Sequence, residues 1–196
     1  MILIPIDPSI SCTGVAVFEL DKLIRCARIK PKQQVQKDGV ITKFTSWQKI
    51  DQIIEALDLL LSEHPGASFS IEITSGKTAG RFGNKKISGL GTYGMVVGQV
   101  VRWAIERVGP DRVHQFYEND WTRQGKKDRR QEHCRYTFPF YAEHWYEQDK
   151  IKHDKSGRYT GGGDVSDAIM LGDYTLQQIK TGMLNPHTAH AGKETK

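Results

Sequence analysis

The sequence predicts one α/β domain built on a mixed five-stranded sheet that is flanked by helices. Three strand-like segments follow one another at the N-terminus, and helices and strands alternate after them. Consecutive strands form antiparallel meanders, whereas strands separated by helices usually pair in parallel. A length of 196 residues suits one domain with one core. We place this domain at residues 1–182 and expect the polar segment 183–196 to be a disordered tail.

The three N-terminal strands are separated by turn signals. The first is almost entirely apolar, which is typical of a strand buried on both faces. Asp7-Pro8-Ser9 follows it and Asp21-Lys22 precedes the third strand, and both have the composition of turns. The expected strands are residues 2–6, 14–19 and 23–29.

Helices and strands alternate through the rest of the chain. Apolar residues at the helical period predict three helices, the first with Ser46 as its N-cap. The expected helices are 46–63, 91–108 and 164–181, and the expected strands are 68–74 and 112–118. The polar or glycine-rich segments 30–45 and 75–90 are expected to be loops. The stretch 119–163 is less regular, with helical patterns at 127–135 and 140–148.

The composition is that of an ordinary globular protein with a formal charge of +5, which suits a polyanionic partner. Its three scattered cysteines indicate reduced thiols rather than a disulfide framework or a zinc site. The N-terminus lacks the features of a signal peptide, and no apolar run reaches the roughly 20 residues of a membrane helix. We therefore expect a cytoplasmic, nucleoid-associated protein without a membrane partner.

Four carboxylates stand where a charge is costly to bury, and we call them the acidic cluster. They are Asp7 at the end of the first strand, Glu72 inside the fourth strand, and Asp164 and Asp167 on one side of the last helix. Each has an ordinary alternative role. These roles are a turn for Asp7, an exposed strand face or edge for Glu72, and helix capping for the two others.

The joint pattern is more specific than any one member of the cluster. Mg²⁺ prefers oxygen ligands, and a nuclease that uses two ions about 4 Å apart needs about four converging carboxylates. The cluster converges if the strands of Asp7 and Glu72 are neighbours and the last helix packs at their ends. The sequence therefore predicts a site for two Mg²⁺ or Mn²⁺ ions, with the acidic cluster as both ligands and catalytic groups.

A family resemblance lies in three short segments, which are Ile6–Gly14, Ile71-Glu72 and Asp164–Ala168. They resemble the opening strand and turn, the second acidic position and the closing Asp-x-x-Asp-Ala helix of RuvC-type Holliday-junction resolvases. This family belongs to the RNase H-like, or retroviral-integrase-like, nuclease superfamily. The resemblance implies an RNase H-like fold, a homodimer, dependence on Mg²⁺ or Mn²⁺, and paired nicks in four-way DNA junctions. The divergent middle favours a phage-type member, in a bacterial or phage-infected cell.

Positive charge is concentrated in residues 76–135, which contain 13 Lys or Arg and 6 Asp or Glu. Basic side chains give sequence-independent, salt-sensitive contacts with phosphates, although most charge runs are simply solvated. The residues expected to bind DNA are Lys77, Arg81, Lys85, Lys86, Arg123, Arg129 and Arg130. Phe82, in the same basic loop, either stacks on an unpaired base or anchors the loop to the core.

Two further features take a role from the resemblance. The family places a basic residue near the scissile phosphate, where it stabilises developing charge, and Lys126 and Lys127 both fit that place. The segment Gly94–Gly98 either packs closely on the sheet or forms a two-fold contact between protomers.

The sequence therefore predicts a Mg²⁺-dependent crossover junction endodeoxyribonuclease that resolves four-way or branched DNA by two-metal-ion hydrolysis, without an organic cofactor. One alternative is an RNase H-like nuclease that acts on forks, flaps or RNA–DNA hybrids. Another is a non-catalytic module that binds branched DNA. An actin-like phosphotransferase also opens with an aspartate and a hairpin, but its duplicated domain needs more than 196 residues.

Overall fold

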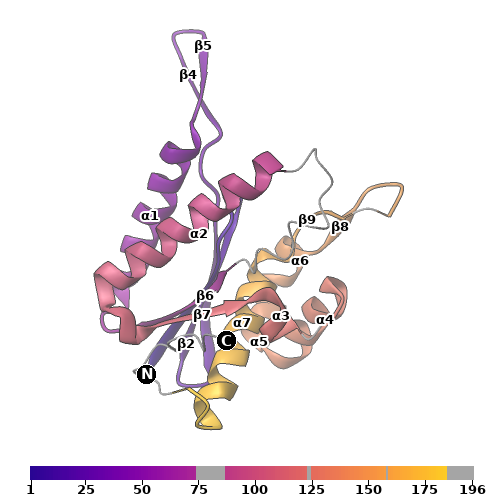
Figure 1. The fold of residues 1–196 in the computed structure, drawn as a ribbon. Helices are drawn as coiled ribbons and strands as arrows, with labels where there is room; N and C mark the ends of the chain where they lie inside the picture. Colours follow the sequence, from indigo (N-terminus) through magenta and orange to yellow (C-terminus); the bar gives the residue numbers. More distant parts are fainter. Residues whose placement is uncertain (74–86, 123–124, 158, 185–196) are drawn as a thin grey trace.

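The structure, a computed structural model, describes residues 1–73, 87–122, 125–157 and 159–184, with residues 87–90 as backbone (Figure 1). Its centre is a five-stranded sheet in the order β3-β2-β1-β6-β7. The strands are β1 (Ile2–Asp7), β2 (Thr13–Glu19), β3 (Lys22–Ile29), β6 (Ser68–Ile73) and β7 (Val113–Tyr117). The first three pair antiparallel, and β1, β6 and β7 pair in parallel, which confirms the predicted mixed sheet.

Helices cover both faces of the sheet (Figure 1). The helices α1 (Ser46–Glu63) and α2 (Ile87–Val108) pack on one face and enclose the larger apolar core. The other face is covered by α4 (Lys127–Thr137), α5 (Pro139–His144), α6 (Tyr146–Asp149) and α7 (Asp164–Lys180). A short helix, α3 (Glu118–Thr122), follows β7 and joins a third apolar cluster with α7. No helix in the described part of the chain is long and apolar enough to span a membrane.

Alternation along β1 decides which face receives Asp7. Ile4 and Ile6 belong to the core under α1 and α2, whereas Leu3 belongs to the core under α4–α7. Because successive side chains of a strand point to opposite faces, Asp7 shares its face with Leu3. The carboxylate therefore points to the face on which α7 packs.

The predicted loop at 30–45 is instead partly a hairpin that projects from the domain (Figure 1). Its strands are β4 (Gln34–Lys37) and β5 (Val40–Lys43), and all eight of their residues are exposed. Asp38 and Gly39 have positive φ angles of 51° and 78°, as required at the two central positions of a type I′ turn. The prediction was wrong because an Asp-Gly turn can order a polar segment that buries nothing.

Other boundaries also differ from the predicted ones. The N-cap of α1 is Thr45 rather than Ser46, and Thr45 and Gln48 form a reciprocal capping box. The helix α2 begins at Ile87, inside the predicted loop, and a 3₁₀ turn, Pro110–Arg112, precedes β7. The irregular stretch contains α3 to α6 and a small hairpin, β8 (Lys152–His153) and β9 (Tyr159–Gly161). Leu184 is buried beyond the expected domain end, and residues 185–196 lie outside the described part.

Candidate functional site

Asp7 and Glu72 stand at the carboxyl ends of two neighbouring parallel strands. The pairing of β1 with β6 sets Pro5 opposite Ser70 and Ile6 opposite Ile71, so the next step brings Asp7 and Glu72 side by side. The strand β6 lies inside the sheet, between β1 and β7. The exposed-face and edge-strand alternatives for Glu72 are therefore wrong.

The face that Glu72 shares is covered by α7. Ser68 and Ser70 are buried there, and the Ser70 hydroxyl lies 2.7 Å from the Thr175 hydroxyl of α7. The hydroxyl groups satisfy one another in this polar strip, which explains how a face with serines can be buried. The same helix therefore closes over the strand that carries Glu72.

Gly14 allows the start of α7 to lie directly against the sheet. It is the partner of Asp7 in the pairing of β1 with β2. A Cβ atom at this position would lie 1.9 Å from the Asp164 carbonyl oxygen, far inside any van der Waals contact. Because glycine has no Cβ, the backbone of α7 approaches closely and brings Asp164 next to Asp7.

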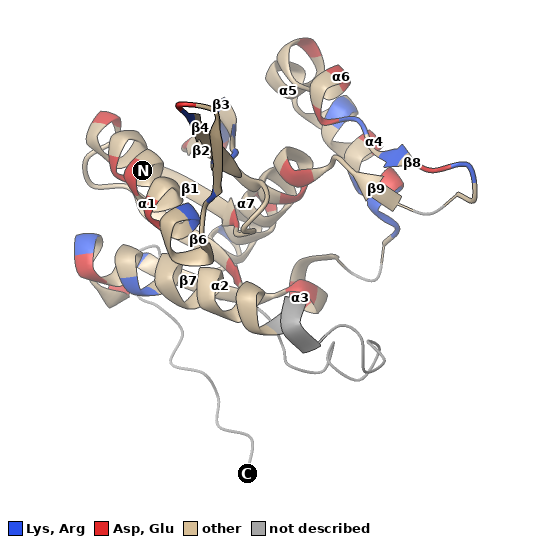
Figure 2. Ribbon diagram, turned by 90° about the horizontal axis from the view of Figure 1, so that it is seen from above, with Lys and Arg blue, Asp and Glu red and all other residues tan. Residues whose placement is uncertain are grey.

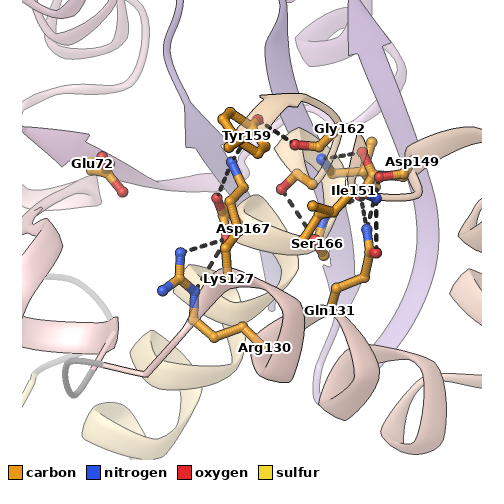
Figure 3. A network of polar contacts seen from close by, with 12 residues as sticks. Glu72, Lys127, Arg130, Gln131, Asp149, Ile151, Tyr159, Gly162, Ser166 and Asp167 are labelled. Carbon is orange, nitrogen blue, oxygen red and sulfur yellow. Dashed lines mark hydrogen bonds and ion pairs between the residues drawn. The ribbon is translucent and has the colours of Figure 1, made fainter. Parts of the chain in front are cut away.

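The cap of α7 comes from another element of the chain. The N-cap residue is Gly163, with a left-handed backbone and no side chain, so the alternative role of Asp164 as the N-cap is wrong. The carboxylate of Asp149, at the end of α6, accepts hydrogen bonds from the backbone N–H groups of Val165 (3.2 Å) and Ser166 (2.9 Å) (Figure 3). Asp149 thus caps the helix that carries two members of the acidic cluster.

Asp149 is completely buried and belongs to a polar network. Tyr141 donates its hydroxyl proton to the Asp149 carboxylate at 3.0 Å. Gln131 donates its side-chain amide to the Asp149 backbone carbonyl at 2.7 Å (Figure 3). Burial raises the pKa of Asp149, while the hydrogen bonds from Ser166 and Val165 oppose that rise. Sequence reasoning missed this residue because its partners are distant along the chain.

Asp167 is held by two cations from α4. The Lys127 Nζ atom lies 2.8 Å from one carboxylate oxygen, and the Arg130 Nη2 atom lies 3.1 Å from the other (Figure 3). Lys127 also donates to the Tyr159 hydroxyl at 3.2 Å, and Arg130 lies over the Trp121 ring. Both cations are therefore packed at the site rather than solvated.

The structure distinguishes between the two candidate lysines. Lys127 contacts Asp167, whereas Lys126 is exposed at the N-cap of α4. Arg129 is exposed on α4, and Arg130 has a side chain only 11% exposed, engaged with Asp167. The remaining residues predicted to bind DNA lie outside the described part of the chain: Lys77, Arg81, Phe82, Lys85, Lys86 and Arg123.

The acidic cluster behaves as one electrostatic unit. Burial raises the pKa of Asp7 well above its ordinary value, and Glu72 and then Asp167 raise it further. Burial, followed by Asp167 and Glu118, raises the pKa of Glu72 to about 7. Burial would lower the pKa of Lys127, but Asp167 raises it and prevails, so this lysine stays charged. The four carboxylates therefore repel one another, and Lys127 offsets part of that repulsion.

Tyr93 of α2 donates a hydrogen bond to Glu72 Oε1 at 3.2 Å. Burial raises the pKa of Tyr93, and the Glu72 charge adds to the rise, so the phenol keeps its proton. Tyr93 was not among the predicted site residues. No strong signal pointed to it, because one tyrosine on a helix is usually part of a core.

The donor chemistry fits a hard divalent cation. All four groups of the cluster are carboxylates. Burial, together with their mutual repulsion, raises the pKa values of Asp7 and Glu72, and the charge of such an ion would relieve that repulsion. Within the described ranges, no three Asp, Glu, His or Cys side chains are already arranged as the ligands of one ion. Figure 3 shows Glu72 apart from the ion pair of Lys127 with Asp167. Binding at Asp167 would require its carboxylate to exchange Lys127 for the metal ion.

The raised pKa of Glu72 in the acidic cluster makes the stability of the folded protein depend on pH. In the metal-free protein, the free energy of unfolding is expected to rise by about 1–2 kcal/mol as the pH falls from about 8 to about 6. The pKa of Glu72 is about 7 in the folded protein, whereas in the unfolded chain it has the lower, ordinary value of a glutamate. Between about pH 8 and about pH 6 the folded state therefore binds more protons than the unfolded state. Urea unfolding at several pH values, in chelator, measures the effect.

The Glu72→Gln variant is the control for this pH effect, because it removes the titrating group. Its unfolding free energy should change much less between about pH 8 and about pH 6. Mg²⁺ should stabilise the wild-type protein more at the higher pH, where the carboxylates are charged. A wild-type stability that falls as the pH is lowered through this range would contradict the proposed charge balance.

Comparison with known proteins identifies the fold. No family model and no curated protein sequence matches the chain. The structure of Thermus thermophilus RuvC in complex with a Holliday junction substrate superposes with a TM-score of 0.62 at 15% identity, covering 94% of this chain and 98% of that one. A second T. thermophilus RuvC structure gives a TM-score of 0.60 with the same identity and coverage. The chain therefore has a RuvC-like fold of the RNase H-like class, as the sequence predicted.

Proposed function

We propose that this RuvC-fold protein is a divalent-metal-dependent endonuclease that cuts branched DNA, with the four-way junction as its preferred substrate. The observation that carries the proposal is that strand register sets Asp7 beside Glu72 and that the start of α7, with Asp164, packs against the strand pair of Asp7 and Gly14. A similar structure that is bound to a Holliday junction substrate supports the choice of DNA. Mutually repelling buried carboxylates destabilise a folded protein, and such arrangements are typical of functional sites. We therefore assign cleavage to the acidic cluster.

The acidic cluster would hold two Mg²⁺ or Mn²⁺ ions, and Tyr93 would fix the orientation of Glu72 through its hydrogen bond. When bound, such ions supply a nucleophilic water at neutral pH and neutralise the leaving oxygen. Lys127, at the same carboxylates, provides a fixed positive charge for the phosphate. Asp149 holds the start of α7 and thereby the positions of Asp164 and Asp167.

We propose that the active form is a homodimer that uses the outer face of α2. Gly91, Gly94 and Gly98 are exposed there. Apart from the adjacent residues and backbone of α2 itself, no atom of the described residues lies within 4 Å of the Cβ positions that these glycines lack. The alternative that Gly94 and Gly98 pack against the sheet is therefore wrong. A two-fold axis would place two sites on two strands of a junction. Light scattering on the purified protein should give twice the mass of one chain.

One cleavage experiment separates the candidate functions. The substrates are a four-way junction, a fork, a flap, a plain duplex and an RNA–DNA hybrid of matched sequence, each with Mg²⁺, Mn²⁺ or a chelator. We expect metal-dependent paired nicks, with the four-way junction cut fastest. Preferred cleavage of forks, flaps or hybrids would favour the related nuclease. Tight junction binding with no product under any condition would favour the non-catalytic module, and ATP turnover without DNA would favour a phosphotransferase.

A further inference from the structure

A cavity of about 530 Å³ opens beside the acidic cluster. One wall comes from the end of β3 and the chain after it, and the opposite wall comes from α6 and the β8–β9 hairpin. Asp164 lines the cavity, whereas Asp7, Glu72 and Asp167 do not. We call this cavity the β3–β9 groove. It therefore shares one member of the cluster and is otherwise built from residues to which the cleavage reaction assigns no role.

The groove carries unpaired positive charge on both walls. Arg28 and Lys30 lie on the β3 side, and Lys152 of β8 lies on the other side. Asp164 is the one acidic residue among the described lining residues. Within the described part of the chain, none of these three cations forms an ion pair, in contrast to Lys127. Figure 2 shows β8 in the colour of basic residues, on the side of the molecule away from α1.

Arg28 and Lys30 line the same cavity as Asp164 and Cys12. Arg28 also lies over the Trp145 ring, 5.9 Å from its centroid, which fixes the guanidinium at the wall of the groove.

The lining favours a phosphate backbone over a small ligand. Pockets for small molecules are mostly apolar and aromatic, with a few polar groups. The aromatic side chain in this lining is Tyr159, whose ring lies under Lys127 and whose hydroxyl donates to the Gly162 carbonyl at 2.5 Å. The other groups include hydroxyls such as Ser11 and Thr160 and the amide of Gln148. Hydroxyl groups, amides and unpaired cations are the groups that contact phosphates and sugars.

We propose that the β3–β9 groove binds the sugar–phosphate backbone of the DNA strand that continues from the scissile phosphate, with Arg28, Lys30 and Lys152 as its phosphate contacts. This inference rests on the proposed nuclease function. The groove fixes which strand of a branched substrate enters the acidic cluster, because the strand must follow the cations from Asp164 outward. It adds a binding surface separate from the basic segment 76–135.

The test compares two double variants that remove the same charge. Lys30→Gln with Lys152→Gln changes the groove, whereas Lys22→Gln with Lys180→Gln changes exposed positions at the start of β3 and the end of α7. Affinity for a four-way junction is measured in chelator over a range of salt concentrations. Loss of two phosphate contacts should make the salt slope of log K shallower by about 1.4–1.8 and weaken binding about tenfold or more at low salt. The control pair should leave both quantities near the wild-type values.

Neutral methylphosphonate linkages at successive positions around the scissile phosphate then locate the contacts. A linkage at a contacted phosphate should weaken binding by wild type but have no further effect on the groove variant. If the two double variants bind the junction with equal affinities and equal salt slopes, and the wild-type protein still cleaves it, the proposed role of the β3–β9 groove is overturned. The nuclease proposal is then unaffected. If a free nucleoside monophosphate binds saturably to the wild type but not to the groove variant, the ligand of the groove is a mononucleotide, and the proposal of a DNA strand is overturned. A wild type that neither binds nor cuts branched DNA would overturn both proposals.

Discussion

The Asp7→Asn variant is expected to cut four-way junctions at least about 10³-fold more slowly than the wild type. Asparagine keeps the size of the side chain but removes the charge that a divalent cation needs from this strand end. The Asp7 carboxylate is the group whose pKa is raised by burial together with the charges of Glu72, Asp167 and Asp164. The variant should bind junctions as the wild type does, because the basic surfaces are unchanged. Single-turnover cleavage and anisotropy binding measure the two quantities.

The same substitution should not destabilise the protein. Removing one charge from a group of mutually repelling carboxylates relieves a cost of folding, so the unfolding free energy should stay equal or increase. The matched control is Asp38→Asn in the β4–β5 turn, where asparagine tolerates the positive φ of 51°. This control should cleave normally. Full cleavage by a pure preparation of Asp7→Asn would contradict the assigned role.

The Asp149→Ala variant is expected to lose about 3–5 kcal/mol of unfolding free energy. The substitution leaves the N–H groups of Val165 and Ser166 and the hydroxyl of Tyr141 buried without their acceptor. It also frees the start of α7, so cleavage should fall even where the protein is still folded. Chemical denaturation followed by circular dichroism, together with cleavage rates at low temperature, tests both effects.

A conservative variant and a neighbouring control define the role of Asp149. Asp149→Asn keeps one acceptor oxygen for the helix and should lose clearly less stability than Asp149→Ala. Glu147→Ala, on the same helix with a side chain 77% exposed, should change stability by less than about 0.5 kcal/mol. A loss below about 1 kcal/mol in Asp149→Ala would show that α7 does not depend on this cap.

The strands, the long helices and their order could be predicted because their apolar patterns are clear. The continuous apolar run of β1 predicts a strand buried on both faces, and the structure places Ile4 and Ile6 in one core and Leu3 in the other. The apolar stripe of α1 predicts the side of the helix that packs on the sheet. The β4–β5 hairpin was missed although Asp38-Gly39 is a strong turn signal. Its strands bury nothing, so no alternation of burial marked them. Thr45 was missed as a cap although its partner Gln48 stands at the required spacing.

The only residues of the candidate site that could be predicted are those that stand in a recognisable local sequence pattern. A carboxylate at the end of an apolar strand and an Asp-x-x-Asp helix start are visible in the sequence. The cap from Asp149 and the approach allowed by Gly14 are tertiary contacts, for which the sequence holds no local signal. The sequence alone does not distinguish Lys126 from Lys127 as the basic residue of the site. In the structure, the start of α4 directs Lys127 toward Asp167 and leaves Lys126 exposed.

Direct measurement of Mn²⁺ binding tests the central claim, which is that the acidic cluster is a site for divalent cations. Metal-free protein is titrated with Mn²⁺, and the signal of the unbound ion is followed by electron paramagnetic resonance. We predict saturable binding to the wild type, competition by Mg²⁺, and greatly weakened binding to Asp7→Asn with no change for Asp38→Asn. Equal Mn²⁺ binding by the wild type and Asp7→Asn, or no binding by either, would contradict the account.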